Sequence, residues 1–168
     1  MRGLFSFPNP VNETAARTVA TGVVVLTVLT LALRSEVLLF VLCAGFWARV
    51  LTGPTLSPLG QFATRVAAPR LSKDPTFVPG PPKRFAQGIG AGLTTLAVIL
   101  YFPLGWVPVA VCLCMLLVAA SLEAFAGICL GCTIFGWLMR AGLVPQGVCE
   151  ECGDLSARYA RATAARAD

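Results

Sequence analysis

Long apolar segments are the feature that most constrains how this chain can fold. The longest, residues 107–140, contains a single carboxylate, Glu123. A helix needs about 20 apolar residues to cross the hydrocarbon core of a bilayer. Only 12% of all residues are charged, about half the share in ordinary soluble domains, and 57% are hydrophobic. The chain therefore has too little polar surface for a globule in water, and we expect lipid to cover its apolar surface.

Four segments have the length and composition of membrane-spanning helices: residues 15–33, 37–51, 84–102 and 107–127. Within lipid, only a helix or a closed barrel satisfies its own backbone hydrogen bonds, so we expect each segment to be helical. The apolar stretch that begins at residue 107 is longer than one crossing. We expect it to break at Gly127 and Gly131, with a short interfacial turn after Cys132. The sequence thus predicts an all-α, polytopic integral membrane protein with one membrane domain over residues 1–168.

The connections between the spans carry further signals. Residues 53–68 have apolar side chains at helical spacing, which predicts a short helix in the membrane interface. Residues 141–168 are polar, and we expect them to form a cysteine-bearing cytoplasmic tail. Gly88 and Gly92 in the third span form a small-x-x-x-small pattern, which predicts close approach to another helix.

The basic residues predict the orientation. All of the 13 Lys and Arg residues except Arg34 lie near the two termini or around the connection between the second and third spans. Cytoplasmic loops of membrane proteins carry an excess of Lys and Arg. We therefore expect a multi-pass protein with both termini and the long connection in the cytoplasm. The net charge of +5 is spread without a dense basic run, so it does not predict nucleic-acid binding.

Cysteine is the residue that could carry chemistry, because the chain has no His and so no imidazole base or ligand. Four of the seven Cys residues form two C-x-x-C pairs, Cys129 with Cys132 and Cys149 with Cys152. An odd number of Cys excludes a fully paired disulfide framework in a monomer. The other three are interpreted as small apolar residues of membrane helices: Cys43, Cys112 and Cys114.

Thiol chemistry is the leading functional prediction. A C-x-x-C pair places an attacking thiolate beside its resolving partner, and a helix N-terminus lowers the pKa of the attacking thiol. Cys129 and Cys132 would form a pair at the membrane edge. Cys149 and Cys152 would meet a cytoplasmic partner, so that the protein exchanges disulfides or relays sulfur.

A four-cysteine zinc site is the alternative. Two C-x-x-C pairs separated by about 15–20 residues are typical of zinc sites. The segment between the two pairs, residues 133–148, has a length within that range. The ligands would be Cys129, Cys132, Cys149 and Cys152, and the protein would be a non-enzymatic membrane scaffold. Both hypotheses require the two pairs to meet at the cytoplasmic surface.

Glu123 is the only carboxylate inside an apolar segment. Such a carboxylate is costly in lipid, so we expect it to be buried and paired with a basic residue, with Arg17, Arg49 and Arg84 as candidates. Its role is either to hold two helices together, or to take part in proton transfer or tune the thiols. Together with the glycines of the third span, it also supports a further alternative, a small transporter or channel subunit.

Several short motifs occur in a distinctive order: Asn9-Pro10-Val11-Asn12-Glu13, Gly53-Pro54, Ser57-Pro58, Pro79-Gly80-Pro81-Pro82-Lys83-Arg84-Phe85-Ala86-Gln87, Glu123-Ala124-Phe125 and the two C-x-x-C pairs. This order resembles an uncharacterised family of small bacterial integral membrane proteins, domain of unknown function 4395. The resemblance implies location in the bacterial inner (plasma) membrane. By association it implies a thioredoxin-like or sulfurtransferase partner.

Overall fold

The computed structural model describes residues 11–71 and 77–143, which are almost entirely helical. The helices in chain order are α1 (Glu13–Leu33), α2 (Glu36–Thr52), α3 (Pro58–Phe62), η1 (Ala63–Ala67), α4 (Ala68–Leu71), α5 (Gly80–Leu104), α6 (Trp106–Ser121), η2 (Leu122–Ala126) and α7 (Leu130–Arg140). Both η1 and η2 are π-helical turns. Two short strands, β1 (Val11–Asn12) and β2 (Phe77–Val78), pair antiparallel. The predicted all-α fold is confirmed.

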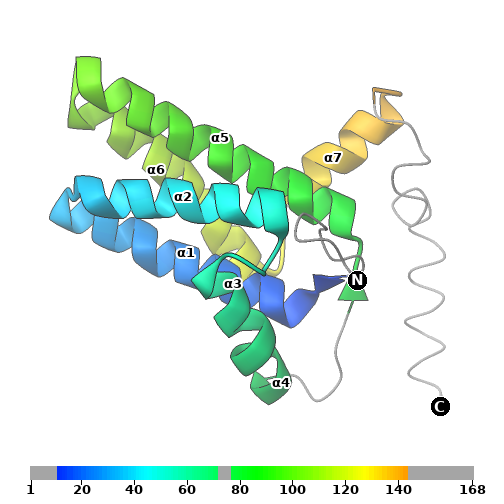
Figure 1. The fold of residues 1–168 in the computed structure, drawn as a ribbon. Helices are drawn as coiled ribbons and strands as arrows, with labels where there is room; N and C mark the ends of the chain where they lie inside the picture. The colour runs from blue at the N-terminus through cyan, green and yellow to red at the C-terminus, as the bar shows by residue number, and fades with distance from the viewer. Residues whose placement is uncertain (1–10, 72–76, 144–168) are drawn as a thin grey trace, which may run out of the picture.

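The helices α1, α2, α5 and α6 form a bundle in which each packs against two neighbours (Figure 1). Tight turns join α1 to α2 and α5 to α6, and both turns lie at the same end of the bundle (Figure 1). In the first turn Arg34 has a left-handed backbone (φ 46°), and Ser35 caps α2 by accepting a hydrogen bond from Leu38 N. In the second turn Gly105 has φ 72°. Successive helices therefore run in opposite directions.

The other end of the bundle is tied together by arginine side chains. Arg17 of α1 donates to the carbonyl oxygens of Ala124 and Phe125, at 3.1–3.3 Å. Carbonyls at a helix C-terminus have no partner within the helix, so Arg17 satisfies two of them in η2. Arg84 of α5 donates to Val50 O of α2 at 3.0 Å. The N-termini of α1 and α5 thus meet the C-termini of α2 and η2.

Three helices are long and apolar enough to cross a membrane: Glu13–Leu33, Gly80–Leu104 and Trp106–Ala126. They leave large apolar side chains on the outside of the bundle, for example Val25, Ile99 and Val118, which are 55%, 60% and 60% exposed. Contiguous apolar surface of this kind is typical of contact with lipid. These features support a membrane protein. Helix α2 has 17 residues, and the number of four spans stays a prediction.

A short arm leaves the bundle after α2. It consists of α3, η1 and α4, and it packs across α1 (Figure 1). Ser57 caps α3 by accepting a hydrogen bond from Gly60 N, and Pro58 occupies the first helical position, where its missing N–H costs nothing. We expected a short helix within residues 53–68; the helical arm begins at Pro58 and continues to Leu71.

The glycines that permit close helix packing differ from the predicted ones. A Cβ atom on Gly88 or Gly92 would meet no atom within 4 Å, so the expectation of close approach at these positions is wrong within this chain. On Gly90, a Cβ atom would lie 2.3 Å from Cε1 of Phe46 in α2. The absence of a side chain on Gly90 therefore lets α5 approach α2. Gly88 and Gly92 do not contribute to this contact, because they lie on other sides of the helix.

Candidate functional site

A buried ion pair lies where α5 begins and α6 ends. Lys83 Nζ is 2.5 Å from Glu123 Oε1, and the two side chains are 11% and 15% exposed. Two charges with little access to water need each other, since removing one leaves the other uncompensated. The expectation that Glu123 is buried and paired with a basic residue is confirmed.

The partner of Glu123 is not one of the three arginines that were expected. Arg17 binds the carbonyls of η2, and Arg84 binds Val50 O. Arg49 donates from Nε to Gln87 Oε1 at 2.9 Å and from Nη1 to Ser57 Oγ at 3.3 Å. From the sequence, the partner of Glu123 was expected among the basic residues that flank the apolar segments. They could not identify Lys83, because the choice depends on how α5 and η2 pack.

The carboxylate of Glu123 is presented by a π-helical turn. In η2 the helix of α6 widens, and it ends at Gly127, whose left-handed conformation (φ 69°) suits glycine. Ile128 N donates back to Leu122 O at 3.1 Å and closes this end. Such π-turns often occur at functional sites. The predicted break at Gly127 is confirmed, and the predicted break at Gly131 is wrong.

A helix, α7, follows the break in place of the predicted short turn. Gly131 lies inside α7, where an added Cβ would lie 2.4 Å from Cβ of Ala86. This glycine therefore allows the first turn of α7 to pack directly on α5. Farther along, the ring centroids of Phe135 and Phe85 lie 5.6 Å apart with the ring planes tilted by 56°, and Met139 is buried in the same cluster. The pair Cys129–Cys132 is in this way held against the start of α5.

Cys129 is the N-cap residue of α7. Its Sγ accepts a hydrogen bond from Cys132 N at 3.4 Å, and its carbonyl accepts one from Thr133 N at 3.0 Å. The unpaired N–H groups and the dipole of a helix N-terminus favour negative charge at this position. The C-x-x-C spacing thus lets the first sulfur cap the helix that carries the second.

The two thiols have pKa values displaced in opposite directions. The hydrogen bond from the Cys132 side chain lowers the pKa of Cys129, and the positive charge of Lys83 adds to this effect, while burial and Glu123 oppose it. The same hydrogen bond and burial raise the pKa of Cys132. Cys129 is therefore the residue that can act as thiolate, and Cys132 is the one that keeps its proton.

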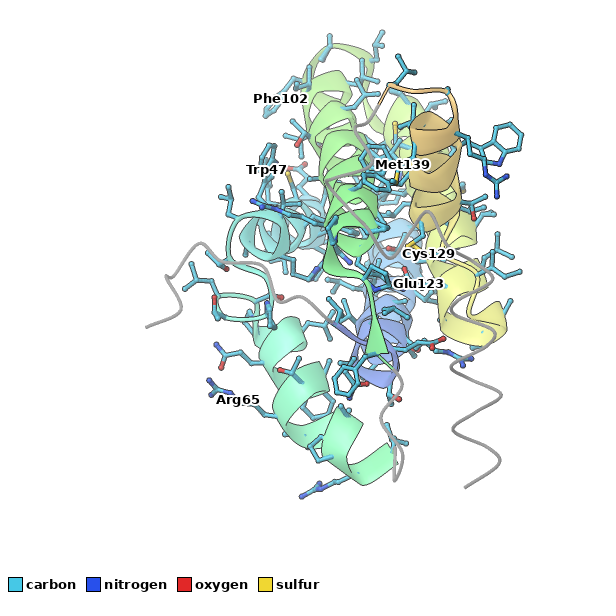
Figure 2. The ribbon with its side chains drawn as sticks, turned by 90° about the vertical axis from the view of Figure 1, so that its right-hand side faces the viewer. Trp47, Arg65, Phe102, Glu123, Cys129 and Met139 are labelled. Carbon is cyan, nitrogen blue, oxygen red and sulfur yellow. The ribbon has the colours of Figure 1, made fainter. Side chains whose placement is uncertain are left out.

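A cavity of about 250 Å³ opens beside Glu123 and Cys129. Glu123 and Cys129 lie at its wall, and most of its other lining residues are apolar. Figure 2 shows the labelled Glu123 and Cys129 close together between α6 and α7, far from the exposed Arg65 of the arm. Glu123 therefore contacts Lys83 at the start of α5 and also borders an apolar cavity within the bundle.

The second C-x-x-C pair, Cys149 with Cys152, lies outside the described residues. Within the part of the chain that is described, no group of three or more potential metal-ligating side chains occurs. Of the remaining cysteines, Cys112 is buried in the main hydrophobic core and Cys114 is exposed. Cys43 Sγ lies 3.6 Å from Thr95 Oγ1.

Two residues of this region were not predicted from the sequence. Lys83 was interpreted only as an orienting charge, and Gln87 had no assigned role. Both belong to the Pro79–Gln87 motif, so the motif itself was the available signal. It did not show that these side chains face the end of α6 from the first turns of α5.

The comparison with known families agrees with the motif order. Residues 11–140 match the family described as Domain of unknown function (DUF4395). The chain belongs to this family. No curated protein and no solved structure matches the chain. The matched range of this DUF4395 protein includes Lys83, Glu123, Cys129 and Cys132, and it ends at the last residue of α7.

The ion pair gives a stability prediction. We expect Lys83→Met to lower the melting temperature of the purified protein in detergent, because a buried pair that loses one partner typically costs about 3–5 kcal/mol. The double variant with Lys83→Met and Glu123→Leu should regain most of this loss, since no charge remains buried. Arg65→Met is the control on an exposed cation. A double variant as unstable as the single one would contradict the pairing.

The thiol environment gives a pH prediction. In reduced protein, we expect alkylation of Cys129 by iodoacetamide to reach half its maximal rate below the ordinary thiol pKa of about 8.5. Cys132 should react only at higher pH. Glu123→Gln removes a negative charge that raises the pKa of Cys129, so the midpoint should fall further. Site-resolved mass spectrometry measures both rates, and an unchanged midpoint in Glu123→Gln would contradict the assignment.

Proposed function

We propose that this protein is a membrane thiol protein that exchanges disulfides, or relays sulfur, with a cytoplasmic partner. The single observation that carries the proposal is the position of Cys129 as N-cap of α7, with Cys132 N donating to its sulfur. This geometry favours a thiolate at Cys129, the form that attacks disulfides. A thioredoxin-like or sulfurtransferase protein is the partner class that we propose.

The exchange reaction needs both cysteines. The Cys129 thiolate would attack a partner disulfide, forming a mixed disulfide and releasing one partner thiolate. Cys132 would then lose its proton and attack the Cys129 sulfur, which forms the Cys129–Cys132 disulfide and releases the second partner thiol. Lys83 and Glu123 set the local charge beside the thiols. Cys149 and Cys152 would afterwards reduce the Cys129–Cys132 disulfide by the same exchange, which leaves their own disulfide facing the partner.

Trapping tests this reaction. Cys132→Ser should accumulate a mixed disulfide with an oxidised thioredoxin-like protein, because the resolving thiol is absent. Cys129→Ser should form none. Cys114→Ser is the matched control, since it removes an exposed cysteine elsewhere in the bundle and should behave as wild type. Gel shift and mass spectrometry identify the product. Equal trapping in Cys129→Ser and Cys132→Ser would refute Cys129 as the nucleophile.

A four-cysteine zinc site is the alternative function for the same residues. The two sulfurs of α7 would supply half of its tetrahedral ligand set, and Cys149 and Cys152 the rest. One zinc per purified chain, with four thiols protected from alkylation, would favour the scaffold. Oxidisable thiols without zinc would favour exchange. A transporter or channel subunit is less well supported, because Lys83 already neutralises Glu123.

We further propose four spans in the bacterial inner membrane, with both termini cytoplasmic. Arg17, Arg49, Lys83 and Arg84 gather at one end of the bundle, and Arg34 lies at the other. The positive-inside rule then assigns the end that carries Cys129 to the cytoplasm.

Reporter fusions test this topology. Fusions after Arg70 and at the C-terminus should both give cytoplasmic signals, and a fusion at Arg34 should give a periplasmic one. A periplasmic signal after Arg70 would refute the arrangement, because the arm follows α2 directly.

A further inference from the structure

The cavity beside Cys129 is lined mainly by apolar side chains, as a binding site for an apolar molecule would be. Its lining comes from α1, α2, α5, α6 and α7, and the larger apolar contributors include Val19, Val23, Phe46, Leu93, Met115 and Leu116. An apolar cavity of about 150 Å³ is known to hold benzene. The volume of about 250 Å³ therefore has room for one substituted six-membered ring. Its walls belong to helices of the membrane bundle, and one lining residue, Met115, is also 58% exposed on the surface of the bundle.

One hydrogen-bond donor in this wall has no partner within the described structure. Gln87 lines the cavity, and its Oε1 accepts a hydrogen bond from Arg49 Nε at 2.9 Å. Arg49 is only 6% exposed and is held by Ser57 Oγ and the ring of Phe46. This contact orients the amide, because Oε1 must face the guanidinium. The Nε2 group is left as a donor, and no described residue accepts from it.

The three features of the cavity together select a class of ligand. The apolar wall requires a lipid-soluble molecule, and the Gln87 donor requires an acceptor such as a carbonyl oxygen. The third feature is Cys129 in the wall, which belongs to a dithiol that must give up two electrons each time its disulfide forms. A benzoquinone ring is apolar, carries carbonyl acceptors and takes up two electrons.

We propose that the cavity binds the ring of a membrane quinone, which oxidises the Cys129–Cys132 dithiol. This inference rests on the proposed thiol function, with the exchange running in the reverse direction: a partner dithiol reduces the Cys129–Cys132 disulfide, and the quinone then accepts the two electrons. In the reaction, the two S–H bonds break and the Cys129–Cys132 bond forms. Two electrons and two protons pass to the quinone, whose two carbonyl groups become the two hydroxyl groups of the quinol. Gln87 holds one ring oxygen, and Cys129 is the sulfur that faces the ring.

Glu123 completes the arrangement as the ionisable group of the cavity wall. Its Oε1 accepts a hydrogen bond from Lys83 Nζ, so a compensated pair of charges lies next to the reacting sulfur. The thiol of Cys132 lies one helical turn along α7 and is not part of the wall. The electron acceptor therefore meets the thiolate first, and the protonated thiol acts second.

Quinone reduction by the full-length, reduced protein in detergent tests the proposal. The probe is 2,3-dimethoxy-5-methyl-6-decyl-1,4-benzoquinone, whose ring carbons are all substituted, so a thiolate finds no unsubstituted ring carbon to alkylate it. We expect loss of quinone absorbance together with the Cys129–Cys132 disulfide, detected by mass spectrometry. Ala119→Phe fills the cavity and should slow this reaction at least about tenfold, as expected for overfilled packing. Val118→Phe on the neighbouring lipid-facing position should react as wild type.

A second variant keeps the test independent of folding defects. Gln87→Glu keeps an oxygen that can accept from Arg49 Nε and removes the Nε2 donor, and we expect a loss of up to about tenfold, the typical effect of one hydrogen bond. Its reaction with oxidised glutathione, a water-soluble oxidant, should stay at the wild-type rate. Quinone reduction that is equally fast in wild type, Ala119→Phe and Gln87→Glu would overturn the quinone site.

The soluble oxidant separates the two proposals. If oxidised glutathione forms the Cys129–Cys132 disulfide in wild type and the quinone does not, the quinone site is refuted and the thiol function stands. If neither oxidant forms this disulfide, the thiol function fails and the quinone step fails with it. Quinone-dependent oxidation that is lost in Ala119→Phe and retained in Val118→Phe supports both.

Discussion

The ion pair between Lys83 and Glu123 is the interaction on which the functional end of the molecule depends. A carboxylate in an apolar segment is tolerated only when a cation compensates it. That requirement brings the first turn of α5 to the last turn of η2, with 2.5 Å between the charged atoms. The pairing also leaves Arg17, Arg49 and Arg84 available for other contacts. Each of them then joins two elements of the bundle through hydrogen bonds to carbonyl or side-chain oxygens.

The break after η2 places the C-x-x-C pair at the start of a new helix, next to the ion pair. Without Gly127 the helix of α6 would continue, and Cys129 would lie on a helical surface rather than at a helix N-terminus. The left-handed turn ends one helix and lets α7 begin with its sulfur-bearing cap. Gly131 then permits α7 to lie directly on Ala86 of α5. Gly127 ends one helix and Gly131 permits close packing of the next, and together they place the two thiols beside Lys83.

The proposed functions share residues but make different demands on them. Disulfide exchange needs one lowered and one raised thiol pKa, which the hydrogen bond between Cys129 and Cys132 provides. Zinc binding needs both thiols deprotonated and two further ligands. Quinone reduction adds a demand on the cavity wall, where Gln87 is oriented by a buried arginine. These demands can be separated by variants, because Gln87 and Ala119 belong to the cavity wall but not to the C-x-x-C pair.

The amino-acid sequence by itself determined the all-α membrane class, the break at Gly127 and the burial and pairing of Glu123. Each of these follows from local chemistry: apolar length, backbone freedom of glycine and the cost of a charge in lipid. Only the tertiary structure decided that Lys83 is the partner, that Gly90 rather than Gly88 or Gly92 permits close packing, and that Gln87 lines a cavity. These outcomes depend on the rotation of one helix against another. Flanking charges and small-residue spacing do not encode that rotation, because several helix faces satisfy the same pattern.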